Sequence, residues 1–270
     1  MYETLSQELK YELYEESVQD PQFDVELFDK IHADFNIESP ALKLREDFCG
    51  TFWLSTKWIK SRPGRSAVGV DLAAEPTAHG KEKHLAKLSP EEQSKFELCQ
   101  CDVRTAPSQN FDFIVALNFS YFCFKKRSEL KAYFQNVYNS LKVDGLFVAD
   151  VLGGTDQLEE NVEENELELN NGQEFKYLWE QKNYNLINNH AEFAINFEYQ
   201  NRIYNNVFTY DWRLWSLTEL QDLLLEVGFR KVKIYMEEDD EEEEGGNGVF
   251  KAVESDESCE TWIANIAALK

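Results

Sequence analysis

Acidic and amide residues stand at the ends of four apolar segments in the first half of the sequence. They occur in Glu46-Asp47-Phe48-Cys49-Gly50-Thr51, at Asp71, in Asp102-Val103 and in Asn118-Phe119-Ser120-Tyr121. A glycine lets a ligand approach the backbone, and the amide groups of a helix that follows it attract a carboxylate. An acid about 20 residues after such a glycine turn has the spacing at which ribose hydroxyls are bound. The pattern therefore predicts a site for a small organic ligand.

The ligand is not expected to be a dinucleotide. Phe48 and Phe52 occupy positions at which the fingerprint G-x-G-x-x-G would have glycines. Without these glycines a pyrophosphate cannot approach the helix closely. A compact ligand with an amino-acid tail fits the segment better. In that arrangement Asp102 would meet an adenine amino group, and the segment that begins at Asn118 would lie beside the reacting group.

The four segments fall where the strands of a parallel α/β sheet should end. Apolar runs alternate with helical patterns, which indicates strands joined by single crossovers, and such sheets bind ligands beyond the carboxyl ends of their strands. A turn at Val143-Asp144-Gly145 precedes the fifth strand. The last two strands have no helix between them and are expected to be antiparallel. The predicted strands are 41–47, 67–71, 96–101, 111–117, 146–151, 229–235 and 261–269, and the predicted helices among them are 51–60, 74–88, 126–141 and 217–227.

Two other segments are expected to surround this core. Residues 1–40 have apolar residues at helical spacing and are interpreted as an N-terminal helical lid. After a polar stretch at 155–172, three aromatic-rich runs alternate in the manner of antiparallel strands. The insertion would either roof a substrate pocket or form a dimer surface. The predicted organisation is a core of 41–154 and 214–270 with an insertion at 155–213, whose strands are 175–183, 191–199 and 202–210.

The composition limits the partners that can be expected. Hydrophobic residues make up 43% of the chain, enough for a packed core, and 27 basic against 51 acidic side chains give a formal charge of -24. Such a field repels polyphosphates, so neither nucleic acid nor an anionic membrane surface is an expected partner. Part of the charge lies in the run Glu237 to Glu244, which is interpreted as a solvated loop. A cytoplasmic location is predicted, because no basic and apolar leader and no long apolar segment are found.

Cysteine and histidine give no metal pattern. The five cysteines, which are interpreted as reduced thiols, have irregular spacing, and the four histidines are scattered. No metal site is therefore predicted. These residues are Cys49, Cys99, Cys101, Cys123, Cys259, His32, His79, His84 and His190.

The strand-end segments resemble those of class I S-adenosylmethionine-dependent methyltransferases. The phrases L-R-E-D-F-C-G-T (44–51), L-N-F-S-Y (117–121) and F-T-Y-D-W-R-L-W (208–215) are similar to those of one subgroup whose substrates are unassigned. The resemblance covers nearly the whole chain. It implies a Rossmann-like sheet of seven strands in the order 3-2-1-4-5-7-6, with strand seven antiparallel, helices on both faces and S-adenosylmethionine as the cofactor. The departures at Phe48 and Phe52 concern the cofactor loop.

The resemblance also implies roles for single residues. Glu46 corresponds to the acid of the first motif and Gly50 to its central glycine, while Asp71 would hold the ribose and Asp102 the adenine. Asn118 begins the motif beside the methyl group. The predicted cofactor-binding residues are Arg45, Glu46, Phe48, Cys49, Gly50, Thr51, Asp71, Leu72, Asp102, Val103, Asn118 and Phe119.

A second set of residues is predicted to act on the substrate. Asn118, Tyr121 and Arg213 are the candidate catalytic residues, and Tyr121, Tyr210, Trp212 and Arg213 are the candidate substrate-binding residues. Aromatic faces suit a sulfonium, and arginine can pair with a carboxylate or phosphate. The alternative is that Trp212 belongs to the core and that Arg213 forms a structural ion pair.

Three functions are compatible with the sequence. The favoured one is methyl transfer to a small-molecule acceptor by a monomer or homodimer. The second is methylation of nucleic acid or protein: Asn118-Phe119-Ser120-Tyr121 is faintly similar to the Asn-Pro-Pro-Tyr motif of DNA amino-methylases, but it has neither proline and the charge opposes it. The third is a regulatory protein that binds S-adenosylmethionine without turnover.

Overall fold

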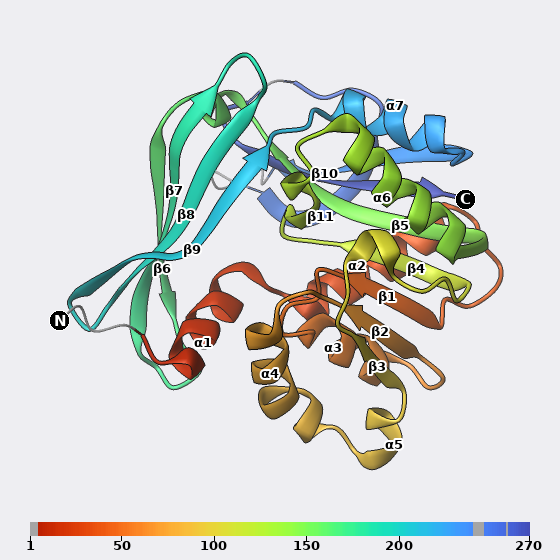
Figure 1. The fold of residues 1–270 in the computed structure, drawn as a ribbon, viewed down its shortest axis with the longest axis horizontal. Helices are drawn as coiled ribbons and strands as arrows, with labels where there is room; N and C mark the ends of the chain where they lie inside the picture. The colour runs from red at the N-terminus through yellow and green to blue at the C-terminus, as the bar shows by residue number, and fades with distance from the viewer. Residues whose placement is uncertain (1–4, 240–245, 258) are drawn as a thin grey trace.

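A large mixed sheet forms the centre of the molecule. The computed structural model describes residues 5–239, 246–257 and 259–270, and within them eight strands pair in the order β11-β10-β12-β5-β4-β1-β2-β3 (Figure 1). β1 to β5 are parallel where they pair, whereas β12 is antiparallel to both β5 and β10. The predicted seven-strand order is confirmed, and β11 adds an edge strand. The strands are β1 (Lys43–Asp47), β2 (Ser66–Val70), β3 (Phe96–Cys99), β4 (Phe111–Ala116), β5 (Leu141–Gly153), β10 (Lys231–Asp239), β11 (Gly246–Val253) and β12 (Trp262–Leu269).

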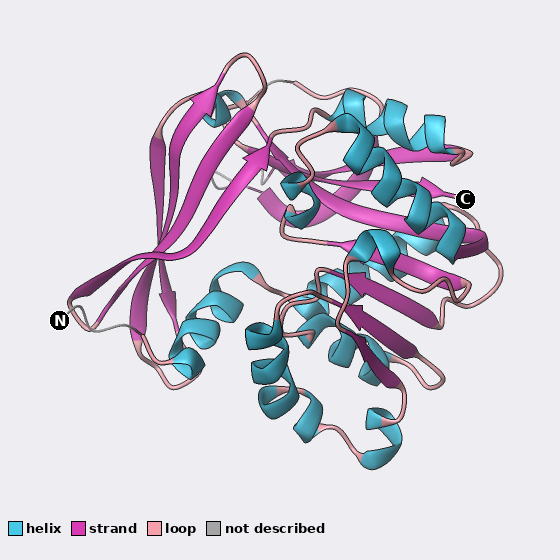
Figure 2. Cartoon of the chain, viewed as in Figure 1, coloured by secondary structure: helices cyan, strands magenta, loops and turns pink. Residues whose placement is uncertain are grey.

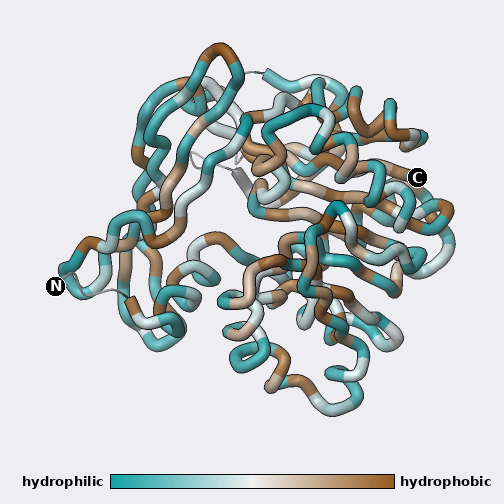
Figure 3. The backbone as a smooth tube through the Cα atoms, in the orientation of Figure 1, coloured by the Kyte–Doolittle hydropathy of each residue, from teal (hydrophilic) through white to brown (hydrophobic). Residues whose placement is uncertain are grey.

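Helices cover both faces of this sheet, as its apolar strands require. In β4, Phe113 and Val115 pack with α2 (Pro21–Asp34) and α3 (Trp53–Ser61). The alternate residue Ile114 packs with α6 (Arg127–Ser140) and α7 (Leu217–Val227). The hydropathy colouring shows hydrophobic stretches in this central layer (Figure 3). The shorter helices are α5 (Pro90–Gln93) and the 3-10 segments Leu85–Lys87, Val103–Thr105, Ser120–Cys123 and Thr155–Leu158.

The bounds of two strands of this sheet, β5 and β10, differ from the prediction. The expected turn at 143–145 lies within β5 as an irregular step, because Phe111 pairs with Leu141 but Phe113 pairs with Leu146. The acidic loop was expected to start at Glu237, but its first three residues belong to β10. Glu238 of these three forms an ion pair with Lys251 of β11. Residues 240–244 of that loop lie outside the described residues.

A second sheet stands apart from the first and is wholly antiparallel (Figure 2). Its last three strands were predicted from their aromatic alternation. The first was missed because it is an edge strand with mostly exposed residues, and an exposed edge needs polar side chains rather than an apolar face. The strands are β6 (Asn161–Glu168), β7 (Glu174–Asn185), β8 (His190–Tyr199) and β9 (Arg202–Arg213).

The first helix connects the two sheets. α1 (Gln7–Val18) begins at Ser6, whose side chain accepts a hydrogen bond from the Leu9 amide. Leu13 of α1 is fully buried with Phe197 and neighbouring side chains of the second sheet. On its other side α1 contacts α4 (Ala74–Lys83), which follows β2 (Figure 1). In the described residues, no helix is both long and apolar enough to cross a membrane.

Close packing of α4 on the segment after β1 depends on Gly80. A Cβ atom at this position would lie 2.2 Å from the Thr51 carbonyl oxygen and 2.8 Å from the Phe52 ring. Real Cβ atoms do not approach backbone so closely, so any side chain here must displace either α4 or the segment that contains Thr51. Glycine is thus required at position 80 because the Thr51 and Phe52 atoms lie so close, and not because of an unusual backbone angle.

We predict that Gly80→Ala destabilises the protein. Alanine is favoured over glycine in a helix by about 1 kcal/mol, but the clash should reverse this and lower the free energy of unfolding by about 1–3 kcal/mol. Urea denaturation measures the difference. Lys81→Ala on the exposed side of the same helix is the control and should change stability by no more than about 0.5 kcal/mol. A stabilised Gly80→Ala variant would contradict the contact.

Candidate functional site

The segment after β1 forms a tight turn with several left-handed residues. Phe48, Gly50 and Phe52 have φ angles of 56°, 50° and 47°. Because Phe52 is left-handed, α3 begins at Trp53 and not at Thr51 as predicted. The Cys49 amide donates to the Val70 carbonyl at 3.1 Å, so the turn is attached to the end of the neighbouring strand.

Asp71 joins this turn to the end of β2. Its Oδ2 accepts a hydrogen bond from the Gly50 amide at 2.8 Å, and its Oδ1 accepts one from the Ala73 amide at 2.7 Å. An added Cβ on Gly50 would have no atom within 4 Å. The backbone there faces open space that a ligand can enter. Leu72, which is 66% exposed, lies directly beside Asp71.

The third strand end carries Asp102 and Val103. Asp102 accepts hydrogen bonds from both Nε and Nη2 of Arg104, and this contact lowers the pKa of the Asp102 carboxyl group. The carboxylate stays ionised and partly exposed. The side chain of Val103 is buried, as are those of Cys49 and Thr51. These three residues can therefore offer a ligand only their backbone groups.

The two acids at the end of β1 point to opposite faces of the sheet. Glu46 is buried beneath α3, where it accepts hydrogen bonds from the Ser55 amide and hydroxyl. Burial raises the pKa of Glu46 to about 8, so this carboxyl group is mainly protonated at neutral pH. Asp47 lies on the side of α6 and accepts hydrogen bonds from Arg45 and from the Tyr133 hydroxyl, both at 2.9 Å.

Arg45 was predicted to bind the cofactor, but its side chain is fully buried in the core. Its guanidinium pairs with Asp47 and donates to Asn136 Oδ1 at 3.1 Å. The alternation of side chains along a strand places Arg45 and Asp47 on the same face. This face packs against α6, away from the open side of the turn.

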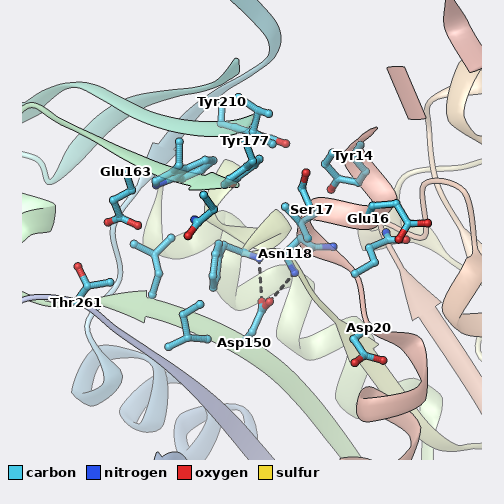
Figure 4. A pocket seen from close by; sticks show the side chains of 18 of the residues that line it. Tyr14, Glu16, Ser17, Asp20, Asn118, Asp150, Glu163, Tyr177, Tyr210 and Thr261 are labelled. Carbon is cyan, nitrogen blue, oxygen red and sulfur yellow. Dashed lines mark hydrogen bonds between the residues drawn. The ribbon is translucent and has the colours of Figure 1, made fainter. Parts of the chain in front are cut away.

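A cavity of about 820 Å³ lies between the ends of β4 and β5, the junction of α1 and α2, and the second sheet (Figure 4). Of the predicted site residues, Asn118, Phe119, Tyr210 and Trp212 line it. Gly50, Asp71 and Asp102 do not; they lie on the neighbouring strand ends. The two groups of residues form adjoining parts of one edge of the sheet, because β1 lies between β2 and β4.

Asp150 forms part of the cavity wall at the end of β5. Its Oδ2 accepts a hydrogen bond from the Asn118 amide at 2.6 Å, and its Oδ1 accepts one from the Phe119 amide at 2.8 Å (Figure 4). Burial raises the pKa of Asp150 to about 7, and the two amides oppose that shift. The carboxylate thus shapes the Asn118 turn and is poised to change its protonation state near neutral pH.

Two of the predicted substrate residues point away from the cavity. Tyr121 is fully buried, and its hydroxyl donates to the Asp150 carbonyl at 2.9 Å. Arg213 stacks on Trp215 with its guanidinium carbon 3.7 Å from the ring centroid, and it pairs with Glu219 at 2.9 Å. Neither residue lines the cavity. Arg213 thus forms an ion pair within the fold, and Tyr121 is buried in the core.

Aromatic residues of the second sheet form the opposite wall. Tyr210 and Trp212 have ring centroids 4.4 Å apart, and Trp179 lies 5.8 Å and 6.0 Å from them. Tyr14 of α1 lines the cavity together with Tyr210. Figure 4 shows Tyr177 and Tyr210 above Asp150, with Tyr14 and Ser17 entering from α1.

Negative charge predominates in the cavity. Among its described lining residues, four are carboxylic acids and one, Lys57, carries a positive charge. Burial raises the pKa values of Glu16 and Glu163, as it does that of Asp150. A bound cation would relieve the mutual repulsion of these groups, whereas an anion would add to it. The four acids are Glu16, Asp20, Asp150 and Glu163.

Sequence reasoning missed several of these lining residues. Asp150 could have been found, because it ends the apolar strand 146–149 in the same way that Asp71 ends 67–70. Tyr14 and Ser17 gave no such signal. Their place in the cavity depends on how α1 packs between distant segments.

Solved structures share this architecture. No protein-family model and no curated protein matches the chain. The structure is similar to Streptomyces venezuelae DesVI, with a TM-score of 0.71, 16% identity and coverage of 98% and 99% of the two chains. For the sugar N-methyltransferase KedS8 from a Streptoalloteichus species the values are 0.66, 15%, 100% and 96%. For an S-adenosylmethionine-dependent methyltransferase from Clostridium acetobutylicum they are 0.64, 16%, 94% and 95%. The chain thus has the fold of S-adenosylmethionine-dependent methyltransferases.

We predict that Arg45→Met lowers the free energy of unfolding by about 3–5 kcal/mol, because Asp47 would remain buried without its partner. Chemical denaturation measures the loss. Arg230→Met, which removes an exposed ion pair with Asp144, should cost less than about 1 kcal/mol. If Arg45→Met left stability unchanged, the structural role of Arg45 would be wrong.

Proposed function

We propose that this protein transfers a methyl group from S-adenosylmethionine to an amine nitrogen of a small molecule. The observation that carries the proposal is the acidic and aromatic cavity of about 820 Å³ beside the turn at Gly50. A cavity of this size accommodates a small organic molecule and not a folded macromolecule. The shared fold supports the choice of cofactor.

The residues of the first three strand ends fit this cofactor. The open backbone at Gly50 and the amides around it would hold the amino-acid tail, and Asp71 would accept hydrogen bonds from the ribose hydroxyls. The ionised Asp102 would face the adenine amine. Phe48 and Phe52 stand where the usual loop has glycines, and they fit the turn because both adopt left-handed backbone angles. Arg45 has no part in this binding.

The chain's own contribution to the reaction is alignment and exclusion of water. When bound, S-adenosylmethionine supplies an electrophilic methyl group on a positively charged sulfur. Asn118 and Phe119 lie between the cofactor edge and the cavity, so the methyl group is expected beside them. The second sheet would roof the acceptor, and α1 and α2 would close the remaining side as a lid.

The acidic wall favours an amine as the acceptor. A protonated amine is attracted by Asp150, Glu16 and Glu163, and its charge can rest against the Tyr210 and Trp212 rings. The ammonium group first gives a proton to Asp150. The freed nitrogen lone pair would then be the nucleophile for the methyl group. Two of the similar structures, KedS8 and the amino pentose methyltransferase CalS10, are described as acting on amino sugars or sugar nitrogen.

The two other functions are less well supported. A polyanionic nucleic acid would meet both the acidic cavity and the formal charge of -24. A regulatory protein without turnover needs no space for a second molecule, whereas this cavity extends beyond Asn118 to the second sheet. Incubation with labelled S-adenosylmethionine and pools of small amines tests turnover directly. Labelled products from amines, but not from RNA or protein, are expected.

We predict that Asp71→Ala lowers the affinity for S-adenosylmethionine by about 10- to 100-fold, because a hydrogen bond to a charged group contributes about 1.5–3 kcal/mol. Isothermal titration calorimetry measures the affinity. Glu97→Ala, an exposed acid on β3, is the matched control and should bind normally. Unchanged affinity in a folded Asp71→Ala variant would refute the assigned cofactor site.

We further predict that methyl transfer depends on the ionisation of Asp150. A base must be deprotonated to act, so the rate is retained above the Asp150 pKa of about 7 and is lost as the pH falls through that value. Asp150→Asn should lower the rate by about 100-fold or more and remove this limb of the pH profile. The pH dependence is measured from single-turnover rates over about 1.5 pH units on either side of the Asp150 pKa. An unchanged profile in Asp150→Asn would exclude Asp150 as the base.

A further inference from the structure

A buried cluster of Glu15, His79 and His84 lies between α1 and α4, outside the cavity described above. All three residues are more than nine-tenths buried, and their ligand atoms lie within 4.8 Å of one another. Glu15 Oε1 is 2.6 Å from His84 Nε2 and 3.9 Å from His79 Nε2. No metal pattern is visible in the sequence because Glu15 is far from the two histidines along the chain.

One ring nitrogen of this cluster lacks a hydrogen-bond partner among the described residues. His79 Nε2 is buried, and no described residue provides it with a hydrogen-bond partner. A buried polar atom without a partner is unfavourable and calls for an explanation. Here the atom faces the carboxylate that already contacts His84, so a cation between the three side chains would satisfy it.

We propose that Glu15, His79 and His84 bind a divalent transition metal ion, best matched by zinc, and that this ion joins α1 to α4. Two imidazoles and one carboxylate, with water as a fourth ligand, are a common zinc set. Zinc holds nitrogen at about 2.0–2.1 Å and oxygen at about 2.0–2.2 Å, which places tetrahedral ligand atoms about 3.4 Å apart. The Glu15–His84 contact must widen by about 0.8 Å and the Glu15–His79 contact must shorten by about 0.5 Å, changes that side-chain rotation provides.

The surroundings hold the two imidazoles in place. The Tyr11 ring lies 5.0 Å from that of His79, and the Trp53 indole stacks on His84 at 5.4 Å with an interplanar angle of 10°. An imidazole binds a metal ion in its neutral form. Fixed rings reduce the entropy that is lost when the ion binds.

The site would link metal binding to the cavity. Tyr14 and Ser17, next to Glu15 on α1, line the cavity, and Trp53 contacts both the cavity and His84. An ion would therefore fix α1 on α4 and with it one wall of the cavity. This inference does not depend on the proposed methyl transfer, because the ion can be detected by binding alone.

The test uses untagged, full-length protein treated with a chelator and then dialysed. Titration with zinc chloride should show one equivalent bound with micromolar or tighter affinity and a raised Tm. Cobalt(II) should give the visible absorption of a tetrahedral complex. Hydrogen exchange of 7–18 should slow when zinc is added, since α1 becomes attached to α4.

Three variants decide the assignment. Glu15→Gln keeps the shape of the side chain, and His79→Phe keeps a ring against Tyr11; each should weaken zinc binding by at least about 100-fold, the upper end of the loss seen for residues that merely support ligands. His190→Phe changes a histidine of the second sheet and should bind zinc normally. Circular dichroism in chelator verifies that all three are folded. Absence of zinc binding by the wild type, or equal binding by Glu15→Gln and His79→Phe, would overturn the proposal.

Discussion

The hydrogen bond from the Gly50 amide to Asp71 is the contact on which the site depends. It joins the turn after β1 to the end of β2 at 2.8 Å, while the left-handed angles of Phe48 and Phe52 direct the chain back into α3. Non-glycine residues rarely adopt such angles, and they persist only where the surroundings enforce them. Here α4 packs directly against this turn, with Gly80 at the contact with Thr51 and Phe52. The cofactor edge is thus shaped by packing from both sides.

Three buried carboxyl groups of β1 and β5 differ in the partners that offset the energetic cost of burying them. Asp47 is compensated by Arg45 and Tyr133, so it serves structure. Among the described residues no cation pairs with Glu46, whose pKa is raised to about 8 by burial, so it is mainly protonated. Asp150 lies between these cases, since two amides partly offset its burial. These three acids, two in β1 and one in β5, therefore differ in their partners, and of the three only Asp150 lines the cavity.

Periodic patterns in the sequence predict most of the strands and helices, whereas features that depend on long-range packing could not be predicted. The seven core strands and the aromatic strands of the insertion follow from alternation and turns, whereas the order of the core strands was implied by the resemblance to class I methyltransferases. The edge strands β6 and β11 were missed because exposed strands lack an apolar face. Arg45 was placed in the site although the two-residue period assigns it to the Asp47 face. The cavity could not be predicted as a whole, because Tyr14 lines it only through the packing of α1.

The position of α1 explains why the second sheet and the core can act together. Leu13 is buried against the second sheet, Glu15 contacts His84 of the core, and Tyr14 faces the cavity between them. Three successive residues thus bind three different parts of the molecule. A rotation of α1 that improved one contact would disturb the other two, because adjacent helical residues point about 100° apart. The helix is therefore held in one orientation. A ligand that binds Glu15 or Tyr14 would act on this same orientation.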